Sequence, residues 1–172
     1  PGYADFLGEV LCALRAVDSA VIVVDAAAGV QVGTEKAWEL LSQAGIPCMF
    51  FITKTDKDGT DSARTLEALK KTFSKNCVFI QSLEDPDLME AIAESDDTLL
   101  EKYLETIKLT QDEIKGGLKK AVITRKLFPV FSGSAATEKG LDEFLDAIVR
   151  YLPNPSERAA LALVDPSASA PC

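Results

Sequence analysis

Two stretches decide the fold of this chain: Cys48-Met49-Phe50-Phe51-Ile52-Thr53-Lys54-Thr55-Asp56 and Leu127-Phe128-Pro129-Val130-Phe131-Ser132-Gly133-Ser134-Ala135. In each, a short apolar run typical of a buried strand passes directly into polar and small residues. A third apolar run, rich in β-branched residues, extends from Ser19 to Asp25 and predicts another strand buried on both faces. Amphipathic stretches of helical length separate these runs. The sequence therefore predicts right-handed βαβ units and an α/β fold with a parallel sheet.

The helices are predicted from apolar periodicity and from end signals. They cover residues 4–17, 34–44, 61–75 and 140–152. The last is expected to turn Leu141, Phe144, Leu145 and Ile148 toward the core. Between Asp56 and Leu127 lies more chain than one helix requires. This segment contains a β-like run at residues 77–81 and at least two helices, one opened by the capping box Thr110-Gln111-Asp112-Glu113.

Composition excludes several classes of protein. The 172 residues, 47% of them hydrophobic, can build one sizeable core. The absence of histidine excludes Ser-His-Asp and Cys-His catalysis and the usual zinc sites, so no metal site is expected. The net charge of −9 opposes direct nucleic-acid binding by this chain alone. No stretch is apolar enough to span a membrane, and no Cys-x-x-Cys pair occurs; Cys12, Cys48 and Cys77 lie in apolar patterns, as buried thiols of a cytoplasmic protein do.

The polar residues that follow the two runs can recognise guanine. The Asp56 carboxylate can accept hydrogen bonds from both the ring N–H and the exocyclic amine of guanine, an arrangement that adenine does not offer. The alkyl stem of Lys54 can lie along the base plane, and the small residues around Ser134 and Ala135 let backbone N–H groups approach the carbonyl edge. No G-x-x-x-x-G-K-[ST] loop is present to hold phosphates. The sequence thus contains half of a nucleotide site.

Five segments, in order, resemble the GTP-binding domain of translational GTPases, and most closely bacterial elongation factor G or a paralogue of it. The tetracycline ribosomal-protection proteins share much of this pattern. The segments are Pro1 to Phe6, Val21 to Gln31, Thr53 to Asp56, Asp97 to Glu105, and Pro129 to Ala135 with Tyr151 to Pro155.

This resemblance implies a partial G domain of the P-loop NTPase type that begins within switch II, at Pro1 and Gly2. Residues 1–76 and 127–155 would form its core, 77–126 a short, mainly helical insert subdomain, and 156–172 a linker or tail. The family's strand order leaves three strands here, near residues 19–25, 48–53 and 127–132. Two positions depart from the family pattern: Tyr3 stands where the family has its catalytic His, and Thr53 where it has Asn.

The resemblance also implies what the longer protein does. The guanine contacts would be Thr53, Lys54, Asp56, Ser134 and Ala135, with Tyr3 at the catalytic position. The intact factor would use GTP or GDP with magnesium, and would work on the ribosome in translocation. Because Tyr3 cannot become a cation, a slow or non-hydrolysing ribosome-binding paralogue is the alternative. A third possibility is a purely structural segment.

This chain alone is expected to hold no nucleotide tightly and to hydrolyse none, because the phosphate-binding loop and switch I are absent from it. It is also expected to self-associate, or to be covered by upstream residues, along the exposed edge of the strand at 19–25.

Overall fold

The computed structural model describes residues 7–106 and 108–157. Tyr3, Pro1 and Gly2 lie outside the described residues, as does the tail beyond residue 157. The elements follow one another as α1 (Leu7–Ala16), β1 (Ala20–Asp25), α2 (Val32–Ala44), β2 (Cys48–Thr53), α3 (Ser62–Thr72), β3 (Cys77–Phe79), α4 (Pro86–Glu94), α5 (Asp97–Thr106), α6 (Gln111–Ile123), β4 (Phe128–Ser132), α7 (Leu141–Tyr151) and a 3-10 turn (Pro155–Glu157).

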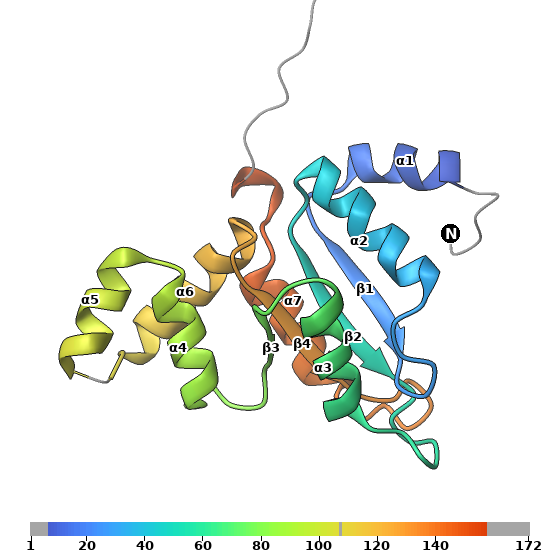
Figure 1. Ribbon diagram of the computed structural model, residues 1–172. Coiled ribbons are helices and arrows are strands. Elements are labelled where there is room, and N and C mark those ends of the chain that lie inside the picture. Colours follow the sequence, from blue (N-terminus) through green and yellow to red (C-terminus); the bar gives the residue numbers. More distant parts are fainter. Residues whose placement is uncertain (1–6, 107, 158–172) are drawn as a thin grey trace, which may run out of the picture.

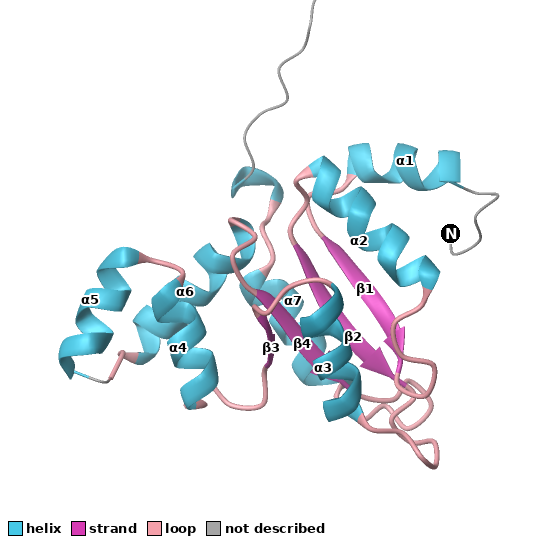
Figure 2. Cartoon of the chain, in the orientation of Figure 1, coloured by secondary structure: helices cyan, strands magenta, loops and turns pink. Residues whose placement is uncertain are grey.

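The strands form one parallel sheet in the order β1-β2-β4-β3 (Figure 2). β1 pairs with β2 along its whole length, from Ala20 opposite Cys48 to Asp25 opposite Thr53. β2 pairs with β4 in a register that sets Ile52 opposite Ser132. The predicted α/β class with a parallel sheet flanked by helices is therefore confirmed, because every strand is joined to the next along the chain through helical crossovers.

The prediction of three strands is wrong. A fourth strand, β3, pairs in parallel with β4, with Cys77 opposite Phe128 and Phe79 opposite Val130. It is only three residues long, so its sequence alone does not distinguish a strand of the main sheet from part of an insert. The division of the chain at residues 76 and 126 stays a prediction, but its boundary at residue 77 would cut β3 from its own sheet.

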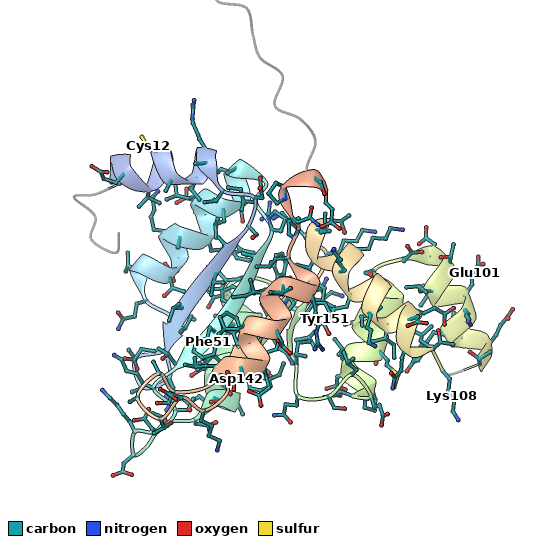
Figure 3. The ribbon with its side chains drawn as sticks, turned by 180° about the vertical axis from the view of Figure 1, so that it is seen from behind. Cys12, Phe51, Glu101, Lys108, Asp142 and Tyr151 are labelled. Atoms are coloured by element: carbon teal, nitrogen blue, oxygen red, sulfur yellow. The ribbon has the colours of Figure 1, made fainter. Side chains whose placement is uncertain are left out.

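Helices cover both faces of the sheet (Figure 1). Successive side chains of β2 point to opposite faces: Phe50 joins the core under α2 and α3, whereas Phe51 joins the core under α7. Trp38 on α2 stacks on Phe50, with ring centroids 5.8 Å apart, and packs edge-on against Phe128. On the other side, seen in Figure 3, α7 lies over the sheet and Phe144 contacts Phe51 at 4.5 Å between centroids.

Helices α4, α5 and α6 form a group beside the main sheet (Figure 1, green to yellow). The predicted capping box at the start of α6 is confirmed, with the Thr110 and Glu113 side chains each accepting from the other's backbone N–H. The apolar face of α6 is buried and shares one core with α7; it comprises Ile114, Leu118, Ala121 and Val122. None of the helices in the described part of the chain is long and apolar enough to cross a membrane.

Several side chains expected in the core are exposed. β1 is an edge strand, and Val23 on it is 59% exposed, so this strand is not buried on both faces as its sequence predicts. Leu145 on α7 is 57% exposed because α7 contacts the sheet through Phe144 and Ala147 instead. Cys12 also lies on the surface, at the outer face of α1 (Figure 3), whereas Cys48 and Cys77 are buried as expected.

Candidate functional site

The residues predicted to contact guanine come together at the carboxyl ends of the strands. The loops that leave β1, β2 and β4 gather at this edge of the sheet (Figure 1, lower right). The register explains the gathering, because Asp25 pairs with Thr53 and Ile52 pairs with Ser132. In open parallel sheets this edge is where ligands bind.

The loop after β2 has an unusual backbone conformation at its first residue, Lys54. Thr53 is partly buried, and its carbonyl accepts from the Ala26 N–H at 2.9 Å. Lys54 then adopts a φ of 62°, in the left-handed region that a residue with a side chain rarely occupies. Thr55 returns toward the neighbouring loop by donating its N–H to the Gly133 carbonyl at 3.3 Å. The backbone of Lys54 is therefore held on both sides.

The loop after β4 is tightly closed, and two glycines make this possible. The Gly133 N–H donates to the Ile52 carbonyl at 2.9 Å, and a Cβ on Gly133 would lie 2.3 Å from the Lys139 carbonyl oxygen. Gly140, with a φ of 76°, would bring a Cβ to 2.5 Å from the Ser132 carbonyl oxygen. The Ser134 N–H donates to Lys139 across the same turn. Side chains at these glycines would thus displace Ser134.

Ser134 connects the two loops through its side chain. The residue is 1% exposed, and its Oγ accepts from the backbone N–H groups of Ala136 at 3.2 Å and Thr137 at 3.3 Å. Hydrogen bonding by the Ser134 hydroxyl, and after it by the backbone N–H of Asp56 itself, holds the pKa of the Asp56 carboxyl below its usual value. From the sequence, the backbone of Ser134 is expected to matter more than its side chain. That expectation stays a prediction, and the interaction with Asp56 adds a role for the hydroxyl.

Two groups at this edge, the Asp56 carboxylate and the Ala135 backbone N–H, are exposed and can hydrogen bond to a ligand. Asp56 is exposed and ionised, so its carboxylate oxygens can accept further hydrogen bonds. Ala135 is exposed as well, and within residues 7–106 and 108–157 its backbone N–H has no acceptor. A carboxylate acceptor and a free N–H donor in adjoining loops match the amine and carbonyl edges of guanine.

Asp25 belongs to this site, although no role is predicted for it from the sequence. It is the last residue of β1, and its Oδ2 lies 2.6 Å from the Lys54 Nζ. The Lys54 ammonium and the N–H groups of Ala27 and Ala28 lower the pKa of Asp25 to about 2. The sequence signal that could have identified Asp25 is its place as an acid at the end of an apolar strand. In a parallel sheet that end lies at the same edge as Lys54.

The acidic side chains of the described region do not form a cation site. Across residues 7–106 and 108–157, no three His, Cys, Asp or Glu side chains are grouped so that they could hold a metal ion. A cavity of about 250 Å³ lies between α3, β3 and α4, with Lys70, Asn76 and Glu90 among its lining residues. It includes none of the predicted guanine contacts.

Comparison with known proteins identifies the family of the chain. Residues 1–154 match the family model described as the elongation factor Tu GTP-binding domain. A crystal structure of a protein from Thermus thermophilus superposes with a TM-score of 0.81 at 33% sequence identity. The match covers 91% of this chain but only 30% of that one. This family implies guanine-nucleotide binding in the intact factor. The chain belongs to the family of the elongation factor Tu GTP-binding domain, and it is a G domain of the translational GTPase type.

Proposed function

We propose that this chain forms the base-recognition half of the GTP-binding domain in a ribosome-dependent translocation factor of the elongation factor G type. The observation that carries the proposal is the Asp56 carboxylate, fixed by the buried Ser134 hydroxyl beside Lys54. Such a carboxylate selects guanine by accepting from two N–H donors on one edge of the base. Ala135 would donate its N–H to the guanine carbonyl. Thr53 would hold the base-recognition loop in place through the hydrogen bond that its carbonyl accepts from the Ala26 N–H.

The chain's residues would orient the base rather than carry out the transfer of phosphate. Lys54 would contribute its alkyl stem along the base plane, since its ammonium is already paired with Asp25. The described residues hold no cluster of metal ligands, so we assign no magnesium contact to them. With no phosphate-binding loop in the sequence, this chain alone would bind GDP or GTP only weakly, at about millimolar concentrations.

The elongation factor G assignment is supported by five ordered segments of sequence, together with the family match over residues 1–154. The structurally similar Thermus protein is about three times as long as the aligned part, which supports a larger factor with further domains. Its partner would be the ribosome, and its place the cytoplasm, where ribosomes work.

The base assignment is tested in the full-length protein by exchanging the acceptor. Asp56→Asn replaces a carboxylate with an amide that complements the xanthine carbonyl. We expect competition titrations with a fluorescent nucleotide to show preference for GDP in the wild type and for xanthosine diphosphate in the variant. Asp58→Asn, an exposed acid in the same loop, is the matched control and should leave the preference unchanged. Retained guanine preference in Asp56→Asn would remove this residue from the pocket.

A second candidate is a slow or non-hydrolysing ribosome-binding paralogue, including the tetracycline ribosomal-protection type. It is favoured by Tyr3, a phenol at the position of the family's histidine, and by Thr53 in place of asparagine. The two candidates differ in turnover. A translocation factor would hydrolyse GTP rapidly when ribosomes are added, whereas the paralogue would remain slow until Tyr3→His restored a group able to carry positive charge.

A further inference from the structure

Asp25 is fixed in place by its own turn before it meets any other element. Its Oδ1 accepts from the backbone N–H groups of Ala27 at 2.8 Å and Ala28 at 3.2 Å. Its backbone carbonyl accepts from the Gly29 N–H at 2.8 Å, and Gly29 has the left-handed φ of 67° that closes this turn. One carboxylate oxygen is thus used locally. The other, Oδ2, faces Lys54.

Lys54 is held both at its backbone and at its side-chain ammonium. Its backbone is fixed in the left-handed region at a φ of 62° between two hydrogen bonds, Ala26 to Thr53 and Thr55 to Gly133. Its ammonium lies 2.6 Å from Asp25 Oδ2. A flexible lysine side chain normally samples many rotamers, and fixing it costs conformational entropy when a ligand must do the ordering. The ion pair with Asp25 restricts these rotamers in the protein without a ligand.

We propose that Asp25 is a positioning residue of the nucleotide site, which holds the Lys54 stem extended along the edge between β1 and β2 so that the base stacks on a preformed surface. This inference rests on the proposed function, since it assigns Lys54 to the base. Asp25 itself touches no nucleotide. It acts through Lys54 by lowering the cost of ordering that side chain on binding.

The alternative role for Asp25 is to stabilise its own turn. Two substitutions distinguish this role from the positioning of Lys54. Asparagine caps such turns as aspartate does, through the same side-chain oxygen. Asp25→Asn therefore retains the acceptor for Ala27 and Ala28 and removes the charge that faces Lys54. Lys54→Met removes the ammonium and retains an unbranched apolar stem.

The test is a double-mutant cycle on the Kd for GDP in the full-length protein, with Asp58→Asn as the control for loss of one acid in this region. We expect Asp25→Asn to weaken GDP binding about fivefold, the size expected from one partly exposed ion pair. In the Lys54→Met background the same substitution should have no effect, because its target is gone. An unchanged Kd in Asp25→Asn, or an equal loss in both backgrounds, would overturn the inference.

A nucleotide-free measurement separates this outcome from failure of the proposed function. In the 172-residue chain labelled with ¹⁵N-lysine, the Lys54 ammonium should give a resolved, slowly exchanging NMR signal that Asp25→Asn abolishes. If this signal behaves as expected but the wild-type protein does not bind GDP, the ion pair stands and both functional proposals fail. If GDP binds and Asp56→Asn switches the base preference while the cycle shows no coupling, only the role of Asp25 is lost.

Discussion

The Ser134 hydroxyl lowers the pKa of the Asp56 carboxyl by hydrogen bonding, and this interaction connects the loop after β4 to the loop after β2. The backbone N–H of Asp56 itself is the second group that lowers this pKa, so both loops contribute to the setting of the acid. Ser134 is itself anchored by the N–H groups of Ala136 and Thr137, so the orientation of Asp56 depends on the backbone of a turn far away in the sequence. The acceptor that would select guanine is therefore a product of the closed turn at Gly133 and Gly140 as much as of the loop that carries it.

Ser134→Ala should weaken nucleotide binding while the fold of the sheet is retained. The substitution removes the donor to Asp56, so the carboxylate loses its fixed orientation and its pKa rises toward the ordinary value. We expect GDP affinity of the full-length protein to fall about fivefold, and a ¹³C NMR titration of the chain to show the upward shift of the Asp56 pKa. Thr137→Ala, which removes an exposed hydroxyl from the same turn, is the control. An unchanged Asp56 pKa in Ser134→Ala would contradict the contact.

Helices α5 and α6 should lose stability in acid, because the ion pair between Lys102 and Glu113 joins them. Lys102 and the Thr110 N–H lower the pKa of Glu113 from 4.5 to about 2 in the folded protein. A lowered folded pKa means that the stabilisation is complete above the unfolded value and is lost as the pH falls through the folded one. The free energy of unfolding should therefore decline between about pH 4.5 and pH 2.

Glu113→Gln checks this by urea unfolding followed by circular dichroism at several pH values. Glutamine still accepts from the Thr110 N–H but does not ionise, so the variant should be less stable at neutral pH and should lose less stability in acid. Glu101→Gln, an exposed acid on α5 (Figure 3), is the comparison. A parallel pH dependence in wild type and Glu113→Gln would argue against this assignment.

Two adjacent glycines of α6 should respond oppositely to alanine. A Cβ on Gly116 meets nothing within 4 Å, whereas one on Gly117 would lie 2.7 Å from both Ile92 Cγ2 and Leu99 Cδ1. Gly116→Ala should stabilise the chain by about 0.5–1 kcal/mol through helix propensity. Gly117→Ala should destabilise it by about 1–3 kcal/mol because α4 and α5 must move away. Thermal or urea unfolding measures both, and equal effects would show that α6 does not pack this closely.

The free edge of β1 should drive self-association of the 172-residue chain. β1 lies at the end of the sheet, and Val23 on it is 59% exposed, so backbone groups and an apolar side chain are both available for pairing. We expect sedimentation velocity to show concentration-dependent oligomers that Val23→Lys disperses. Val149→Lys, at an 81% exposed position on α7, should not disperse them. A compact monomer at all concentrations would contradict this prediction.

Local patterns in the sequence were sufficient to predict strands β1, β2 and β4 and most of the helices. The β2 run predicted a strand because a continuous apolar stretch can be buried on both faces, and Phe50 and Phe51 do enter opposite cores. The capping box at Thr110 was predicted because its hydrogen bonds join residues three apart. Asp56 and Ser134 follow directly after such strands, so the parallel topology brought both to one edge of the sheet.

Only the tertiary structure decided the features that depend on contacts between residues distant in the sequence. Strand β3 was recognised through its pairing with β4, because a three-residue run has too little pattern of its own. Leu145 was expected inside and is exposed, because periodicity defines an apolar face but not which part of it the sheet covers. The contact of Asp25 with Lys54 follows from the register of β1 on β2, which hydrogen bonds between strands set. Residue types and local spacing thus determine which elements form, whereas the chemistry of the site depends on how those elements align.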